Sequence, residues 1–347
     1  MKNEKRKLTI HDLAKRANVS VATISRCLNP ETRNKVAPET LRAIDALIEQ
    51  YHYTPNIAAQ HMRQASHRTI GILFPHHEGI FLSEYYSYIL SGISDSLLNT
   101  HYTLKMILLK ATPPRWDRYD FKAGEGVDGL IVTYWRSFFS NASVIEQLKI
   151  PCVVINNVED DVKAHYVAGD HFQGGELAAQ YLYFHGHRNI AVMSGRDGAP
   201  DAYHRLKGFL SFMNLKGFPV NPELILDTGF EEEKAYHLTG QLVSIHPQIT
   251  AIFCMNDILA FGVMKKLKEL GIDCPGRISV MGYDNDRRAE HSNPPLTTLH
   301  AHVYEAAKRS AECLIQHLKD KDSKGPEFTR ELLPISLVER GSVRKID

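Results

Sequence analysis

From Thr69 onward, short apolar runs alternate with segments of helical periodicity, and this alternation limits the chain to few folds. In the first series, strand patterns cover residues 69–74, 104–109, 129–133 and 152–155, and helical patterns cover 84–98 and 175–184. In the second series, strand patterns lie near 190–194, 251–254, 278–282 and 333–337, and helical patterns near 203–215, 233–245, 258–270 and 303–318. Strands that alternate with helices form parallel sheets covered by helices. We therefore predict an α/β core of two similar lobes.

The composition is that of a globular protein, since 43% of the 347 residues are hydrophobic and 23% are charged. This length exceeds one ordinary core and indicates two or three domains. No apolar stretch approaches the roughly 18–20 residues of a spanning helix, and residues 1–7 lack the apolar block of an export signal. We expect a cytoplasmic protein without a membrane partner. The five cysteines are scattered and predict neither a disulfide framework nor a thiolate zinc site.

The first 68 residues are basic, although the whole chain has a net charge of only +1. They contain twelve lysines and arginines against six acidic residues, whereas the remainder contains twenty-nine against thirty-four. A basic head on a mildly acidic body suits a protein that binds a polyanion with one end. A solvated charged arm would have the same composition, so charge alone leaves both interpretations open.

The basic head begins with the pattern of a short helix and a tight turn. Residues 9–17 predict the helix, because Thr9 and Asp12 have the spacing of a capping box. Asn18 tolerates the left-handed backbone that a tight turn needs. Ser20 then has the side chain of a residue that caps a second helix.

The second helix, which ends at about Leu28, has an inward and an outward face. Ile24 and Leu28 repeat at helical spacing and should face the core, and a third helix begins at Pro38. A second helix that follows so short a turn fits the DNA major groove, although an ordinary helical hairpin has the same pattern.

The outward residues of the second helix have side chains suited to DNA. Arg26 can form a bidentate pair with guanine, while Val21 and Ala22 allow close approach and can contact thymine methyl groups. Ser20 and Thr23, with the backbone amides at the start of the helix, can hold phosphates.

The run from Leu8 to Asn29 closely resembles the N-terminal DNA-binding domain of the lactose-repressor/galactose-repressor family. The segment from Tyr51 to Asn56 resembles the family's lead-in to its hinge, and the Val21-Ala22 pair is similar to that of galactose-type regulators. The resemblance implies a helix-turn-helix DNA-binding domain followed by a two-lobed, periplasmic-binding-protein-like core of parallel sheets. It implies DNA contacts from Thr9, Ser20, Val21, Ala22, Thr23, Ser25, Arg26, Asn29, Tyr53, Asn56, Ala59 and Met62.

In this family, the residues after the Pro-Asn step form a hinge helix that folds on DNA and opens the minor groove. Met62 stands here where the family usually has leucine, and Gln60 where arginine is common. Methionine is an apolar wedge between base steps but is more flexible. We assign a headpiece to 1–55, a hinge to 56–67 and a core to 68–347, with lobe 1 at about 68–160 plus a segment near 290–320, and lobe 2 at about 161–289 plus 321–340.

The third helix departs from the family pattern at its start. Ala37 sits where a capping serine is common, which should loosen the helix by roughly 1 kcal/mol. The loop at 30–35 is about two residues longer than usual in the family.

Aromatic and polar side chains follow the predicted strands of the core. Ligands of parallel sheets bind beyond the carboxyl ends of the strands, and two lobes would face each other across a cleft. Such side chains suit a sugar, whose C–H faces stack on rings and whose hydroxyls pair with planar polar groups. Taken singly, they are commonly turn formers or helix caps. They include Phe81, Tyr134, Trp135, Asn156, Asn157, Asn256, Asp257, Tyr283 and Asp284.

The resemblance covers nearly the whole chain and narrows this set. By motif position it implies that Arg205, Asn256 and Asp284 make polar contacts to a sugar. Asn156 stands where the family often has aspartate, and Ala301 where some sugar-binding members have glutamine, so the identity of the ligand stays open. The candidate ligand-binding residues, aromatic walls included, are Phe81, Tyr134, Asn156, Arg205, Phe230, Asn256 and Asp284.

The chain has 18 histidines, and the pairs at 76/77, 185/187 and 300/302 raise the question of a metal site. His187 belongs to a structural landmark of the family, and no cysteine or carboxylate is expected beside the pairs. We predict no metal site and no cofactor.

These patterns favour a ligand-controlled transcription regulator. We expect a homodimer that binds a near-palindromic double-stranded DNA operator and responds to a small-molecule effector, a sugar or sugar derivative. A solute-binding protein would share the two-lobed body, but the basic head argues against it. The sequence disfavours an enzyme, because no Gly-x-Gly-x-x-Gly loop follows a strand and no Walker loop or Gly-x-Ser-x-Gly elbow is present.

Overall fold

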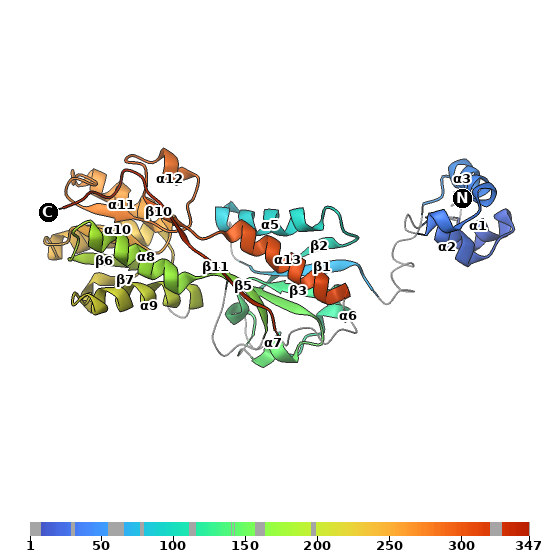
Figure 1. Cartoon of the computed structure of the whole chain (residues 1–347), viewed down its shortest axis with the longest axis horizontal. Helices are drawn as coiled ribbons and strands as arrows, with labels where there is room; N and C mark the ends of the chain where they lie inside the picture. The colour runs from blue at the N-terminus through green and yellow to red at the C-terminus, as the bar shows by residue number, and fades with distance from the viewer. Residues whose placement is uncertain are drawn as a thin grey trace, which may run out of the picture. The chain divides into compact units, whose positions relative to one another are not determined.

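The computed structural model divides the chain into two compact units, Met1–Arg68 and Thr69–Asp347. It describes residues 8–28, 32–54, 66–76, 80–110, 116–139, 141, 143–156, 164–195, 199–319 and 328–346. We call the first unit the headpiece and the second the core, and Figure 1 shows the elements of both. Within these described ranges, no helix is both long and apolar enough to cross a membrane.

The headpiece consists of three α-helices, α1 (Ile10–Ala17), α2 (Val21–Leu28) and α3 (Pro38–Tyr51), with the short 3-10 helix η1 (Arg33–Lys35) before α3. The capping box at the start of α1 is confirmed: the Thr9 side chain accepts from the Asp12 backbone N–H, and the Asp12 side chain accepts from the Thr9 backbone N–H. Asn18 ends the helix at φ 52°, so the tight turn has the predicted left-handed residue.

A small core joins the three helices of the headpiece. Its buried side chains are Leu13, Ala14, Ile24, Cys27, Ile44 and Tyr53. Arg33 braces this arrangement, because its Nη1 donates to the Cys27 carbonyl at 2.9 Å and its Nη2 pairs with Asp45 on α3. Ile24 and Leu28 both face this core, as predicted: Ile24 is fully buried and Leu28 packs against the core half-buried. Cys27, which was not predicted to face inward, is also fully buried.

The start of α3 lacks a side-chain cap, which leads to a prediction about stability. Ala37 is the N-cap and makes no capping hydrogen bond, and Pro38 is at the first helical position. Since a serine hydroxyl there would accept from a free backbone N–H, Ala37→Ser should raise the free energy of unfolding of the headpiece by about 1 kcal/mol. Thermal unfolding of residues 1–68, compared with Ala37→Gly, measures this. An Ala37→Ser headpiece no more stable than wild type would contradict it.

The first lobe of the core is a six-stranded parallel sheet with the order β11-β5-β4-β3-β1-β2 (Figure 1). Its strands are β1 (Thr69–Pro75), β2 (Thr103–Leu109), β3 (Gly129–Val132), β4 (Cys152–Ile155), β5 (His165–Gly169) and β11 (Arg330–Leu333). On one face, α5 (Glu84–Leu97) and α13 (Val303–Lys319) pack against each other and on the sheet. The other face is covered by residues of α6 (Phe121–Glu125), α7 (Ser143–Gln147) and the 3-10 helix η3 (Trp135–Ser137). The 3-10 helix η2 (Ile80–Leu82) precedes α5.

The second lobe is a four-stranded parallel sheet with the order β7-β6-β8-β9. Its strands are β6 (Ile190–Ser194), β7 (Ile225–Asp227), β8 (Ala251–Cys254) and β9 (Ser279–Met281). Its helices are α8 (His171–Phe184), α9 (Pro200–Leu215), η4 (Pro222–Leu224), α10 (Glu232–Ile245), α11 (Asp257–Glu269) and α12 (Arg288–His291). Helices α8 and α9 lie in close contact, since a Cβ at Gly175 would stand 2.0 Å from the Arg205 carbonyl oxygen. This contact fixes the position of Arg205 on α9.

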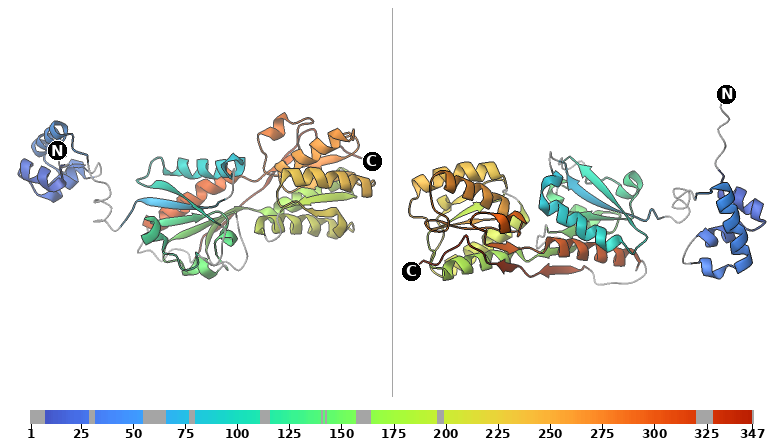
Figure 2. Two further views of the ribbon diagram at one scale, coloured as in Figure 1. Left: turned by 180° about the vertical axis from the view of Figure 1, so that it is seen from behind. Right: turned by 90° about the horizontal axis from the view of Figure 1, so that it is seen from above.

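The chain passes between the lobes three times: from β5 to α8, from β10 (Thr298–His300) to α13, and from β11 to β12 (Ser336–Val338). Strands β10 and β12 pair antiparallel beside these crossings. Figure 2 shows the last strands of the chain running from one lobe to the other.

Two expectations about the lobes are wrong. Strands β5 and β11 pair with each other and belong to the first sheet, although we assigned 161–289 and 321–340 to lobe 2. Residues 290–300 belong to the second lobe, where Thr297 bridges to Met281.

The strand expected at 333–337 is two strands, because Pro334 lacks the N–H that a continuous ladder needs. Edge strands depend on long-range pairing, which local periodicity does not report.

Candidate functional site

Helix α2 presents the outward residues that the sequence predicted. Ala22 and Arg26 are exposed, and Val21, Thr23 and Ser25 are half-buried. Among the described residues, no carboxylate pairs with Arg26. Arg26 is exposed, so its side chain can reach a partner outside the headpiece.

The hydroxyls expected to hold phosphates also cap the helices. Ser20 Oγ accepts from the Thr23 backbone N–H at 3.1 Å and lies 2.9 Å from Thr23 Oγ1, while Thr9 Oγ1 donates to Asp12. Tyr53 is 8% exposed and packs in the headpiece core, so only a small part of its ring reaches solvent. Four more predicted DNA contacts lie outside the described residues: Asn29, Asn56, Ala59 and Met62.

Arg205 is the centre of the polar cluster in the core, although it is only 2% exposed. Its Nη1 donates to the Met255 carbonyl at 2.5 Å, and its Nη2 lies 3.6 Å from Asp201 and 3.7 Å from Asp284. Its guanidinium carbon lies 3.9 Å above the ring of Tyr283. Burial opposes the charge, but the carboxylates and the tyrosine outweigh it, so the pKa of Arg205 is raised. The cluster therefore holds a charged guanidinium away from bulk water.

Asp284 meets Arg205 without completing a hydrogen bond to it. Its Oδ1 is buried and has no hydrogen-bond partner in the described part of the chain, and its backbone has φ 106°. Burial raises the pKa of Asp284 to about 7, because the opposing effect of Arg205 is partly cancelled by Asp201. The Oδ1 atom of Asp201 is likewise buried without a partner. Two carboxylate oxygens beside one buried cation are the acceptors that a ligand with hydroxyl or N–H donors requires.

The raised pKa of Asp284 predicts a pH dependence of stability. The folded protein holds this proton to about pH 7, whereas an unfolded aspartate loses it near about pH 4. The stability from Asp284 is thus complete below about pH 4 and is lost as the pH rises through about 7. Urea unfolding measures this as the fall in the free energy of unfolding between pH 5 and pH 8. That fall should be on the order of 1–3 kcal/mol larger for wild type than for Asp284→Asn. Parallel curves for the two proteins would contradict this.

Three residues of the cluster were not predicted from the sequence: Tyr85, His171 and Asp201. Tyr283 was among the residues after strands that suit a sugar, but it was not in the narrowed set of ligand-binding residues. His171 Nδ1 lies 3.0 Å from the Tyr283 hydroxyl and accepts from Arg205 Nε at 3.4 Å. Burial, followed by the charge of Arg205, holds the pKa of His171 well below its usual range, and its Nε2 is buried without a partner in the described ranges. A neutral imidazole therefore supports the guanidinium.

Tyr85 brings the first lobe to the same cluster. It is on α5, and its hydroxyl accepts from Asn156 Nδ2 at 3.3 Å. Burial and then the charge of Asp201, on the second lobe, raise the pKa of Tyr85. Since Asn156 has φ 56° and follows β4, it places its amide at the carboxyl end of the first sheet, as predicted.

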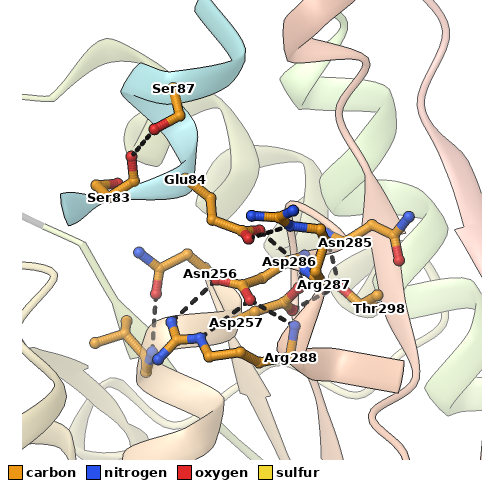
Figure 3. A network of polar contacts seen from close by, with 11 residues as sticks. Ser83, Glu84, Ser87, Asn256, Asp257, Asn285, Asp286, Arg287, Arg288 and Thr298 are labelled. Carbon is orange, nitrogen blue, oxygen red and sulfur yellow. Dashed lines mark hydrogen bonds and ion pairs between the residues drawn. The ribbon is translucent and has the colours of Figure 1, made fainter. Parts of the chain in front are cut away.

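The remaining predicted ligand-binding residues have structural contacts of their own. Asn256 Oδ1 caps α11 by accepting from the Leu259 N–H at 2.9 Å, and Figure 3 shows its Nδ2 pointing away from that helix. Phe81 packs edge-on against Phe74 and is 37% exposed. The ring of Phe230 covers Gly195, where a Cβ would stand 2.0 Å away, and Tyr134 is half-buried against the core. The structure thus joins Arg205 to Asp284, and Asn256 is the sequence neighbour of Met255, whose carbonyl accepts from Arg205.

A polar network joins the lobes near this cluster (Figure 3). On the first lobe, Glu84 begins α5 and accepts from Arg287 of the second lobe, at 3.0 Å from its backbone N and 2.6 Å from its Nε. Asp286, next to Arg287, pairs with Arg288 at 3.0 Å. Buried Asp257 accepts from the Asp286 backbone N–H at 2.7 Å, and burial raises its pKa well above its usual range.

One histidine pair has a carboxylate beside it, contrary to the expectation from sequence. The ligand atoms of His300, His302 and Glu305 all lie within 4.8 Å of one another. Residue Glu305 joins the pair because it is in the first turn of α13, immediately after the crossing. By contrast, both ring nitrogens of buried His187 have partners: Nδ1 lies 2.9 Å from Thr250 Oγ1, and Nε2 lies 3.1 Å from the Arg344 carbonyl oxygen. These contacts give His187 a structural role.

Comparison with known proteins finds similarity over nearly the whole chain. Residues 9–56 match the bacterial regulatory proteins of the lacI family, and residues 179–343 match a periplasmic binding protein-like domain. The HTH-type transcriptional repressor PurR of Vibrio parahaemolyticus is 31% identical over 348 residues, which cover 98% of this chain and 99% of that protein.

Two solved structures show the same fold. The lac repressor dimer bound to operator and the anti-inducer ONPF has a TM-score of 0.82 at 23% identity and covers 98% of this chain and all of its own. The complex of the transcriptional regulator CelR with cellobiose has a TM-score of 0.71 at 23% identity, over 97% of this chain and all of its own.

Proposed function

Because the chain belongs to the lacI family of bacterial regulatory proteins, in which its relatives are DNA-binding repressors and not enzymes, we propose that it represses a carbohydrate-related operon. In this proposal the headpiece binds a specific DNA operator in the cytoplasm. A small molecule bound between the two lobes of the core then changes the affinity for that operator.

The observation that carries the effector proposal is the cluster around Arg205. A buried guanidinium converges there with two carboxylates, each of which has a buried oxygen without a hydrogen-bond partner in the described part of the chain. Neighbouring hydroxyls of a sugar supply both donors and acceptors, so they satisfy a cation and carboxylates together. A sugar, cellobiose, is the ligand in the complex of the similar regulator CelR.

A planar heterocycle is the second candidate effector, and the aromatic residues are as compatible with it as with a sugar. Phe81 is in η2 of the first lobe and Phe230 precedes α10 of the second, and rings of this kind stack on flat bases as well as on sugar faces. A heterocycle with N–H groups would donate to Asp284 and Asp201. The two candidates differ in which compounds stabilise the protein.

The DNA half of the proposal requires a homodimer. A two-fold dimer places two α2 helices on half-sites related by symmetry, which predicts a near-palindromic operator. The proposed coupling needs an effector that prefers one arrangement of the lobes, and effector and operator must then change each other's affinity by the same factor. The contact of Glu84 with Arg287 would distinguish two arrangements of the lobes, because it can form only when the lobes are close.

One paired experiment tests the proposal. The purified full-length chain selects duplexes from a randomised DNA pool, and a thermal-shift screen uses sugars, sugar phosphates and nucleobases. We expect a near-palindromic consensus and stabilisation by a sugar, with operator affinity changed by that same compound. Stabilisation by nucleobases alone would show that the effector is a heterocycle and not a sugar. The absence of any DNA consensus would contradict the proposal that the chain is a repressor.

A further inference from the structure

Three potential metal ligands meet where the chain crosses from the second lobe to the first. His300 ends β10, His302 follows in the crossing, and Glu305 is in the first turn of α13. The imidazole rings of the two histidines are 4.2 Å apart between centroids, and His302 Nδ1 lies 3.8 Å from Glu305 Oε2. All three ligand atoms lie within 4.8 Å of one another.

The two imidazoles are oriented before any ion binds. His302 Nε2 lies 3.3 Å from Ser336 Oγ, which leaves its Nδ1 on the side of Glu305. Metal-binding histidines usually have this arrangement, with the second nitrogen held by a hydrogen bond. His300 is half-buried, and its Nδ1 is buried without a hydrogen-bond partner in the described part of the chain. A buried nitrogen without a partner is costly in a folded protein, and a bound ion would satisfy it.

We propose that His300, His302 and Glu305 form a binding site for a divalent transition-metal ion of the Zn²⁺ type. Imidazole and carboxylate ligands suit this class of ion, and three protein ligands with one water complete a tetrahedral shell. Ligand atoms around tetrahedral Zn²⁺ are roughly 3.3 Å apart. The side chain of Glu305 is exposed, so its rotation can bring the carboxylate closer to the two imidazoles.

An ion at this place would tie together segments that move when the lobes move. His300 and His302 belong to the second crossing, Ser336 belongs to the third, and Glu305 is anchored in the first lobe through α13. The backbone of Asp284 reaches the His300 ring, so the site also adjoins the cluster around Arg205. Binding of the ion therefore stiffens the crossings, independently of whether the effector is a sugar.

Metal titration of the chelator-treated full-length chain tests this. Co²⁺ serves as the spectroscopic probe and Zn²⁺ as the competitor, with equilibrium dialysis to count ions. We expect one saturable ion per chain with a tetrahedral Co²⁺ spectrum, and a rise in melting temperature. The variant His302→Asn should lose this ion, and it keeps the backbone because asparagine tolerates the φ of 50° at that position. Glu305→Gln should also lose the tetrahedral spectrum, and Ser336→Ala should weaken binding about 10- to 100-fold.

A matched control is present on α10. His237 Nε2 and Glu233 Oε1 are also 3.8 Å apart, but both side chains are exposed, and no third potential ligand joins them among the residues that the structure describes. His237→Asn should bind the ion as wild type does. The proposal is overturned if wild type binds no tetrahedral ion, or if His302→Asn, Glu305→Gln and His237→Asn all bind it equally.

Discussion

Replacing Arg205 with alanine is expected to destabilise the core by about 3–5 kcal/mol and to abolish its stabilisation by an effector. The substitution removes the cation that lies 3.6 Å from Asp201 and 3.7 Å from Asp284, and it leaves two half-buried carboxylates without that cation. It also removes the donor to the Met255 carbonyl. Urea unfolding measures the first effect, and thermal shifts with the compounds from the screen measure the second.

A second arginine in the same lobe supplies the control. Arg188 stacks on Tyr183 at 3.7 Å and donates to its carbonyl, but it pairs with no carboxylate among the described residues. Arg188→Ala should lose packing and still respond to effector. The double variant Arg205→Ala/Asp284→Asn should recover part of the lost stability, since it removes one of the uncompensated charges. An Arg205→Ala protein that still shows the full thermal shift would place the effector elsewhere.

Replacing Arg26 with alanine is expected to weaken binding to the selected operator by roughly 5- to 150-fold and to change binding to random DNA little. Arg26 is exposed on α2, and a bidentate pair with guanine from this position would contribute about 1–3 kcal/mol of discrimination. Competition binding at one fixed salt concentration measures both affinities, because phosphate contacts make each of them salt-dependent.

The exposed Arg42 on α3 separates specific recognition from loss of charge. Arg42→Ala removes the same charge from the headpiece, so it should weaken both kinds of DNA binding by a similar, smaller factor. If Arg26→Ala behaves like Arg42→Ala, Arg26 contacts only phosphate and the reading surface of α2 must be reassigned.

The headpiece was predictable from sequence because its signals are local. The Thr9–Asp12 box, the turn at Asn18 and the missing cap at Ala37 each depend on neighbours within a few residues. The inward face of α2 was less predictable. The helical spacing of Ile24 and Leu28 does not point to Cys27, which is also fully buried, because burial along a short helix depends on the helices packed against it.

The cluster around Arg205 was predicted in part, for a physical reason. Residues after strands are identifiable because parallel sheets gather their carboxyl ends, and this rule found Asp284 and Asn156. It cannot find Tyr85 or His171, which reach the cluster from helices, because their direction depends on how those helices pack. The same limit explains Glu305, which joins two histidines only after the crossing has folded.

The three crossings also set an order in which the chain can fold during its synthesis. The first sheet is complete only when β11 pairs with β5 in the register Arg330↔Tyr166, more than 160 residues later in the sequence. The headpiece, by contrast, closes on contacts within its first 54 residues. A ribosome that stops before residue 330 therefore releases a fragment with a finished headpiece and with β5 as an unprotected edge. Such a fragment would retain the folded headpiece and most of the core but lack β11 and β12, two strands of the third crossing between the lobes.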